Sequence, residues 1–423
     1  MKTRFALAVT MFLALVPVTL LVPGLHELVV VAHGGTTADA HAFMTVNMVA
    51  GMLGVPFAMR MARRGHDVRR WIAAALVLDA LAFVGMRVAP SLPLLYVFRL
   101  MDGAVHLPAV TLLMLASNRV SGDARGGTLG AVATGLMIGV AIGSPLGGWL
   151  VERGPSLVYD AGAALLLLGA VSAIAVPPIP ASADPRPRRS FAFDRGRLQG
   201  WIPLGYAFMD RFSIGVFVST FTLFLTQVHA LTASQRGLLI ALFMIPFALL
   251  CYPAGRLADR VGWFAPMMLG NVCFGIVFAA YGVVPRSLLP VAMLLSGVLS
   301  ALMFTPNLLL ISDLARRGHG EGLFGAFQVA GSLGFLVGPI VGGVLLSLTR
   351  GDDPVGGYRM IFALVGALEG ALALVAWQAL RSLAREVHAS REAAVARGAP
   401  VPPVAAVTPA LSASAGASPP PRA

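Results

Sequence analysis

The chain alternates long apolar runs with short polar segments. Most runs are about 20 residues long, the length that an α-helix needs to cross the hydrocarbon core of a bilayer. The pattern predicts about twelve membrane-spanning helices, near residues 5–31, 41–61, 71–89, 93–117, 127–150, 156–177, 201–227, 235–254, 265–284, 288–312, 323–348 and 359–380. The first run is also consistent with a shorter helix that ends before His26, or with a signal peptide that follows Lys2 and Arg4, although its length favours a membrane helix.

Composition supports this pattern. Only 12% of the 423 residues are charged, whereas soluble domains have about a quarter of theirs charged. So few charges cannot cover the surface of a soluble protein of this size, and we expect an all-α polytopic membrane protein. The net charge of +12 could indicate a nucleic-acid partner. The basic residues lie in short gaps between apolar runs, however, so we expect a lipid bilayer as partner and no nucleic acid.

The basic residues also predict the orientation of the chain. With an even number of spans, both termini lie on one side of the membrane. That side holds most of the 31 Lys and Arg residues, and only six lie in the opposite loops: Arg87, Arg153, Arg236, Arg286, Arg350 and Arg359. Because basic loops face the cytoplasm, we expect both termini in the cytoplasm and a multi-pass protein in the inner membrane of a bacterium.

A Pro- and Arg-rich segment divides the chain near its middle. We expect an N-terminal six-helix bundle at 1–178, a basic cytoplasmic linker at 179–200, a C-terminal six-helix bundle at 201–381 and a cytoplasmic tail at 382–423. The tail begins with an amphipathic pattern over 385–397. Its Pro/Ala/Ser-rich end, 399–423, is too poor in large apolar residues to fold, so most of the tail is expected to be disordered.

Glycines recur every four residues in two spans. A step of four places them on one helix face, where a neighbouring helix can approach closely. The fifth span holds Gly135, Gly139, Gly143 and Gly147, and the eleventh holds Gly334, Gly338 and Gly342. The two sets superpose with a shift of 195 residues. This internal duplication predicts two pseudo-symmetric six-helix bundles, an architecture typical of secondary transporters with the substrate site between the halves.

Short motifs in these segments resemble those of the major facilitator superfamily of transporters. The segment GRLADRVG is similar to the superfamily's cytoplasmic loop motif, and this resemblance implies a gating role for Gly255, Asp259, Arg260 and Gly262. The segment GFLVGPIVGG, with Pro339, resembles the glycine-proline motif of the antiporters. The fifth span reads GVAIGSPLGG, with its proline one place later, at Pro145.

The fourth span contains a third resemblance. Arg99 to Gly103 is similar to the family motif R-x-x-Q-G, whose arginine is tied to proton coupling, although Asp102 replaces the usual glutamine. The first-half loop also departs from the family pattern, with Met59 and Arg63 in place of Gly and Asp. Taken together, the motifs most resemble drug:proton antiporter-type efflux pumps.

Ionisable side chains inside the apolar runs are the candidate functional residues, because such groups are costly in hydrocarbon. Arg99, Asp102 and His106 lie on one face of the fourth span. A carboxylate beside a permanent cation stays ionised until that partner moves, as a proton-coupling site requires. We therefore assign proton coupling to Arg99 and Asp102 and place His106 in the substrate cavity. A fixed structural ion pair is the alternative.

Further candidates lie in the second half. Asp210 is about 14 Å from the end of the seventh span, near the midplane, and is a second candidate for proton coupling. Its neighbour Arg211 need not pair with it, and we expect Arg211 and Asn307 in the substrate cavity. Asp79 and Glu369 are expected to form structural pairs, since their spans resemble the family's supporting helices.

The resemblance implies a secondary active transporter, and the preferred prediction is proton-coupled efflux of small molecules or drugs by alternating access. A symporter that imports a sugar or another metabolite is one alternative. A non-transporting sensor is another, supported only by the degenerate first-half loop. The sequence contains no Walker A loop and no nucleophile arrangement, so we expect neither an enzyme nor a cofactor or metal site. Protons and a small-molecule substrate are the expected partners of a monomer.

Overall fold

The computed structural model describes residues 2–63, 67–120, 125–176, 198–314, 322–349 and 354–396. Helices make up nearly all of these residues, and none of them forms a strand. The all-α prediction is therefore confirmed. Most of the predicted linker and the end of the tail, 397–423, lie outside the described residues.

Two sets of helices follow one another along the chain. The first comprises α1 (Lys2–Leu20), the π-helical turn η1 (His26–Val31), α2 (Thr37–Arg63), α3 (Val68–Val88), α4 (Leu92–Val120), α5 (Arg125–Arg153) and α6 (Pro155–Ala175). The second comprises α7 (Leu198–Val216), the π-helical turn η3 (Phe217–Phe221), α8 (Thr222–Gln227), α9 (Ala233–Val261), α10 (Phe264–Ala280), the short 3-10 turn η4 (Arg286–Leu288), α11 (Leu289–Leu314), α12 (Gly322–Leu348) and α13 (Pro354–Ala396).

The helices account for the twelve predicted spans. Ten of the described helices are long and apolar enough to cross a membrane, and two shorter apolar helices, Phe5–Leu20 and Phe264–Ala280, occupy the positions of the first and ninth spans. The first span ends before His26, as the shorter interpretation had it. The last span differs from the prediction: α13 continues without a break through the amphipathic segment and ends at Ala396.

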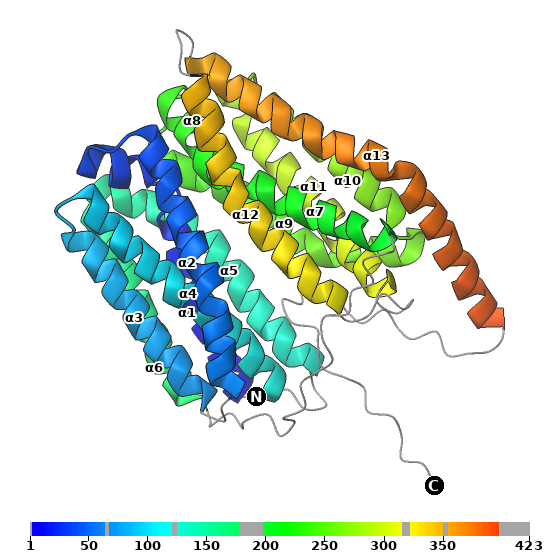
Figure 1. Ribbon diagram of the computed structural model, residues 1–423, viewed down its shortest axis with the longest axis horizontal. Helices are drawn as coiled ribbons and strands as arrows, with labels where there is room; N and C mark the ends of the chain where they lie inside the picture. Colours follow the sequence, from blue (N-terminus) through cyan, green and yellow to red (C-terminus); the bar gives the residue numbers. More distant parts are fainter. Residues whose placement is uncertain are drawn as a thin grey trace.

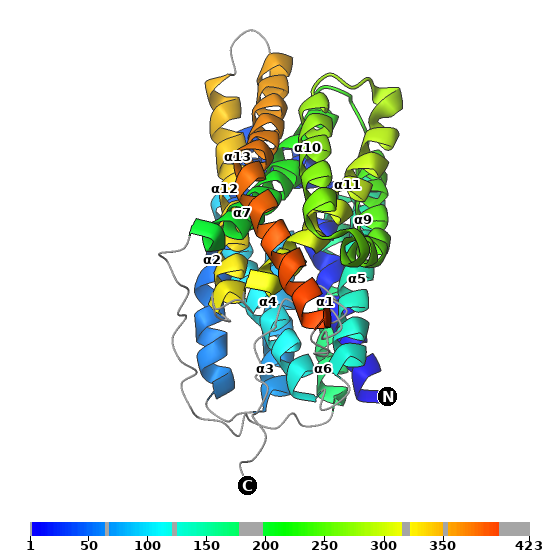
Figure 2. The same cartoon turned by 90° about the vertical axis from the view of Figure 1, so that its right-hand side faces the viewer.

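The two bundles meet at one end and diverge toward the other (Figure 1). They lie close together where η1 connects α1 to α2, here called the η1 end, and they separate toward the end that carries the N-terminus. Figure 2, turned by 90°, shows α13 running along the outside of the second bundle. At the η1 end, α5 packs against α9 and α12 packs against α2, so each bundle contributes one helix to each contact.

The repeated glycines lie where helices approach most closely. In the first bundle, a methyl group on Gly135 or Gly147 would overlap a backbone carbonyl of α1. In the second, a methyl group on Gly334 or Gly338 would overlap a backbone carbonyl of α7. The α1–α5 and α7–α12 pairs are thus equivalent contacts in the two halves, and they allow direct backbone packing where lipid provides little hydrophobic driving force.

The remaining residues of the glycine motif have related positions. A methyl group on Gly139 would crowd the carbonyl oxygen of Phe12, one on Gly143 would overlap the side chain of Thr19, and Pro145 lies beside Gly237 of the other bundle. In α12, Pro339 lies against Gly215 of α7, and a methyl group on Gly342 would overlap the hydroxyl of Thr220.

Candidate functional site

A buried ion pair lies within the first bundle. The Nη1 group of Arg99 donates to Oδ2 of Asp102, one helical turn further along α4. The side chains of Arg99 and Asp102 are 5% and 4% exposed. The guanidinium also lies over the ring of Phe43 in α2, 4.6 Å from its centroid, a cation–π contact that helps to hold the charge away from water.

Helix α2 completes the environment of Asp102. The side-chain amide of Asn47 donates to Oδ2 of Asp102 at 2.9 Å. A methyl group on Gly103 would overlap the backbone carbonyl of Asn47, so the glycine that follows Asp102 allows α2 to approach α4 at this point. Asn47 lies within the predicted span 41–61, and nothing in that span alone shows which residue of another helix it faces.

A second polar pair adjoins the first. Nδ1 of His106 and Oδ2 of Asp79 in α3 are 2.6 Å apart. The Asp79 side chain is completely buried, and that of His106 is 12% exposed. Asp79 does form a pair, but it forms it with a residue of the candidate site rather than in a separate supporting contact. His106 thus faces Asp79 within the bundle, and its placement in the substrate cavity stays a prediction.

The four side chains form one cluster, which we call the α4 cluster: Asp79, Arg99, Asp102 and His106. Ligand-type atoms of Asp79, Asp102 and His106 all lie within 4.8 Å of one another, a spacing that a cation could use. The guanidinium of Arg99 already occupies Asp102 and would repel a metal ion. The charge of the cluster therefore favours a proton over a metal.

In the second bundle, Asp210 and Arg211 approach each other although they are adjacent in α7. Nε of Arg211 lies 3.5 Å from Oδ2 of Asp210, so the two charges interact. The Arg211 side chain is 36% exposed, and its guanidinium lies 5.5 Å from the ring centroid of Phe304 in α11. The sequence left open whether Asp210 and Arg211 pair with each other, and in the structure they do.

Asp210 borders a small cavity between α7, α10 and α11. Its lining is mixed polar and aromatic: Tyr206, Asp210, Asn271, Met303, Phe304 and Asn307. The structure thus brings together Asp210 and Asn307, two candidates that the sequence identified separately. The side-chain oxygen of Asn307 is buried and has no hydrogen-bond partner among the described residues, so it is available to accept from a ligand.

Glu369 of α13 lies apart from this cavity. Its carboxylate accepts a hydrogen bond of 2.9 Å from the hydroxyl of Ser213 in α7, and the residue is fully buried. The other carboxylate oxygen has no partner among the described residues. The contact joins α13 to α7, in agreement with the structural pairing expected for this residue.

The predicted gating motif ends α9. Gly262 follows the last helical residue with φ of 85°, a left-handed conformation that favours glycine. Gly255 lies about one helical turn before Asp259. A methyl group on Gly255 would be 3.2 Å from the side-chain methyl of Thr305. Arg260 is exposed, and the side chain of Asp259 lies outside the described residues, as do those of Met59 and Arg63.

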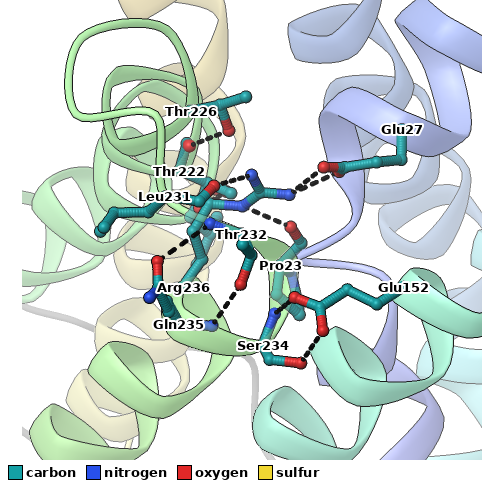
Figure 3. A network of polar contacts seen from close by, with 11 residues as sticks. Pro23, Glu27, Glu152, Thr222, Thr226, Leu231, Thr232, Ser234, Gln235 and Arg236 are labelled. Carbon is teal, nitrogen blue, oxygen red and sulfur yellow. Dashed lines mark hydrogen bonds and ion pairs between the residues drawn. The ribbon is translucent and has the colours of Figure 1, made fainter.

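Contacts between the bundles gather at the η1 end, where Arg236 of α9 reaches into the first bundle (Figure 3). Its Nη2 group lies 2.5 Å from both carboxylate oxygens of Glu27 in η1. Nε donates to the carbonyl oxygen of Pro23 and Nη1 to that of Leu231, each at 2.8 Å. The Arg236 side chain is 1% exposed, so this bond between the halves is shielded from water.

Three further contacts join the halves at this end. The backbone N–H and the hydroxyl of Ser234 donate to the carboxylate of Glu152 at 2.8 and 2.6 Å. Nε2 of His41 lies 3.0 Å from the hydroxyl of Thr220. The Gln227 amide donates to the Thr37 hydroxyl at 3.1 Å.

The sequence of the chain matches a known family throughout. The model of the Major Facilitator Superfamily matches residues 7–224 and again residues 204–417. The quinolone resistance protein NorA of Staphylococcus aureus (strain N315) is 28% identical over 170 residues. That alignment spans 40% of this chain and 41% of NorA, so it covers less than half of either protein.

Solved transporters share the fold. The nucleoside transporter NupG superposes with a TM-score of 0.69 at 15% identity, over 89% of this chain and 98% of NupG. An inward-facing bacterial homolog of the human lysosomal transporter Spinster superposes with a TM-score of 0.72 at 15% identity, over 88% and 96% of the two chains. At such identities the likeness concerns the fold alone. With two matches to one family model and two bundles of six spans, the chain belongs to the Major Facilitator Superfamily, whose members carry small molecules across membranes.

Proposed function

We propose that this transporter exports small molecules in exchange for protons, by alternating access between its two bundles. The observation that carries the proposal is the buried Arg99–Asp102 pair of α4, with Asn47 of α2 hydrogen-bonded to the same carboxylate. Charges inside a membrane bundle are costly and mark ion or substrate pathways. A pair that contacts two helices can change its protonation as those helices move.

The arrangement of the bundles is compatible with the loading step of an exporter. With both termini in the cytoplasm, as the basic loops predict, the η1 end faces away from the cytoplasm. Arg236 and Glu27 hold the bundles together at that end, and the bundles diverge at the other (Figure 1). This arrangement would admit substrate from the cytoplasm. It suits a monomer in a bacterial inner membrane, with the predicted linker at 179–200 and the tail from 382 on the cytoplasmic side.

The second bundle offers a place for the substrate. Asp210 supplies a negative charge beside the aromatic rings of Tyr206 and Phe304, and Asn307 supplies a free acceptor. Cations are attracted both by carboxylates and by ring faces. We therefore assign a cationic or aromatic molecule to this region, with Arg211 at its border and Asp210 as a second group able to exchange a proton.

Efflux is supported by the similarity to NorA, whose name refers to quinolone resistance. The likeness to NupG concerns the fold, so it does not favour import of a metabolite over efflux. An importing symporter differs from the proposed antiporter in one observable: its substrate and its protons move in the same direction. A non-transporting sensor would move neither.

The experiment uses inverted membrane vesicles that hold a proton gradient, reported by a quenched acridine dye. Addition of an exported cationic dye such as ethidium, or of a quinolone, should release protons and restore fluorescence. Arg99→Ala and Asp102→Asn should abolish the response at equal expression. The control is Arg153→Ala, because Arg153 is exposed and its guanidinium lies over the ring and donates to the carbonyl of Trp149, away from the α4 cluster.

The outcomes separate the candidate functions. Proton-coupled efflux is supported if the fluorescence recovers in wild type and in Arg153→Ala but not in the two α4 variants. The symporter would be supported if no drug or dye restores the fluorescence and if a sugar or nucleoside acidifies the vesicle interior. A response that both α4 variants retain would overturn the assignment of coupling to α4.

A further inference from the structure

The α4 cluster has an unbalanced charge. Arg99 carries one positive charge, and Asp79 and Asp102 carry two negative charges when ionised. With His106 neutral, the cluster would hold a net negative charge inside the membrane. Its own side chains are almost completely buried, so water cannot compensate that charge. An uncompensated buried charge is strongly unfavourable. One additional proton makes the cluster neutral.

The hydrogen bonds indicate where that proton is held. Asp102 is already compensated by the guanidinium of Arg99 and by the amide of Asn47. Oδ2 of Asp79 lies 2.6 Å from Nδ1 of His106, the Asp102 carboxylate lies close by, and Oδ1 of Asp79 is buried without a partner among the described residues. Nε2 of His106 is likewise buried and unpartnered. The proton that neutralises the cluster therefore has its best position between these two side chains.

We infer that Asp79 and His106 together form the exchangeable proton site of the first bundle, with the Arg99–Asp102 pair acting as its electrostatic counterpart. This inference rests on the proposed function and makes it more specific. The sequence assigned the proton to Asp102, the acid within the family motif. The structure favours instead a carboxylate–imidazole pair formed by α3 and α4. This pair takes its proton from water and releases it to water.

In the part of the chain that the structure describes, no other charge near the pair changes this count. Helix α6 contributes Tyr159, which lies edge-on to Phe83 and within electrostatic range of Arg99, but its hydroxyl is neutral. Helix α2 contributes the neutral amide of Asn47. The next charges on α3 and α6, Arg87 and Asp160, pair with each other at 2.9 Å and are each more than 40% exposed.

The charge count also explains how proton release could be linked to movement. When the proton leaves, Asp79 becomes a second carboxylate within 4.8 Å of Asp102, and the two negative charges repel each other. Release therefore favours a rearrangement of the Arg99–Asp102 pair, and with it of the α2–α4 contact through Asn47. Binding of a proton restores the arrangement seen here.

The test is a proton count on purified full-length protein in detergent, without substrate, across about pH 5 to 8. Asp79→Asn should remove one titrating proton. His106→Gln leaves two carboxylates beside one guanidinium, so it should keep that proton but move its titration midpoint, and the double variant should match Asp79→Asn. Asp102→Asn should release the proton from the pair, because the cluster is then neutral without it. Asp160→Asn is the matched control on a solvated acid and should leave the titration of the cluster unchanged.

A second measurement covers variants that fail to fold. Infrared difference spectra of the wild type between the two ends of the titration should contain a band from a buried protonated carboxyl or imidazolium that shifts in His106→Gln. Titrations of Asp79→Asn and His106→Gln that match the wild type would overturn the inference. So would loss of the proton in Asp102→Asn combined with its retention in Asp79→Asn.

The vesicle assay distinguishes this failure from failure of the proposed function. If export remains proton-coupled with an unchanged pH profile in both Asp79→Asn and His106→Gln, the inference is wrong and the function stands. If wild type shows no proton-coupled export but the cluster titrates as described, the function is wrong and the proton site stands.

Discussion

Glu27 and Arg236 join the two bundles through an ion pair in which Nη2 of Arg236 lies 2.5 Å from each carboxylate oxygen of Glu27. Arg236 is buried, and its other donors bond to the carbonyls of Pro23 and Leu231 (Figure 3). Every guanidinium nitrogen is thus used at the closed end. Because the partners belong to different halves, this contact must break whenever the η1 end opens.

Removing the charge of Glu27 should shift the protein toward the state that is open at the η1 end. We expect Glu27→Gln to cost about 2 kcal/mol, the contribution of a hydrogen bond to a charged group, or roughly a thirtyfold change in the ratio of closed to open states. Distances between spin labels at the exposed positions Val31 and Val283 should increase. Asp39→Asn is the control: Asp39 lies at the same end and bonds to Thr36 and Tyr96 of its own bundle, so this variant should have a much smaller effect.

Acidification should open the same end. Burial lowers the pKa of His26, Arg236 lowers it further, and Glu27 opposes them, so the closed state favours the neutral imidazole. In the open state the pKa returns to about 6.5. The open state then binds more protons, and the stability of the closed state falls as the pH falls below that value.

The same label distances should therefore increase between about pH 7 and 5. Burial and Arg286 lower the pKa of His229, which acts in the same direction. His26→Gln should reduce the pH response, and addition of His229→Gln should reduce it further. A response that is undiminished in the double variant would show that other groups titrate.

Gly103→Ala should destabilise the protein and impair transport. The added methyl would overlap the carbonyl of Asn47, separate α2 from α4 and weaken the bond from Asn47 to Asp102. Overpacking of this kind costs about 1–3 kcal/mol. The melting temperature in detergent should fall. Gly370→Ala is the matched control, because a methyl group there meets nothing within 4 Å, and it should leave the melting temperature unchanged or higher.

Asp210→Asn should discriminate between substrates by charge. Loss of the carboxylate beside Tyr206 and Phe304 removes the attraction for a cation but leaves the aromatic surface intact. We expect KM for a cationic dye to rise about tenfold, equivalent to about 1.4 kcal/mol, with a smaller change for a neutral compound. Equal losses for both compounds would indicate a structural or coupling role for Asp210 instead.

The sequence by itself determined the architecture. Run length and hydropathy are local properties, and a helix in lipid must satisfy its backbone hydrogen bonds within itself. The twelve spans could therefore be placed, and the glycine steps in α5 and α12 identified the faces that other helices approach. The family motifs also identified Arg99 and Asp102 as a possible pair, because residues three apart on one helix are neighbours.

Only the tertiary structure decided which residues of different helices meet. Nothing in α3 alone shows that Asp79 faces His106, since that contact depends on the rotation of two helices about their axes. Asn47 reaches Asp102 only because Gly103 allows α2 to come close. The Glu27–Arg236 contact joins residues 209 apart and depends on how the two bundles dock. Periodicity determines the faces of a helix, but packing determines the partner of each face.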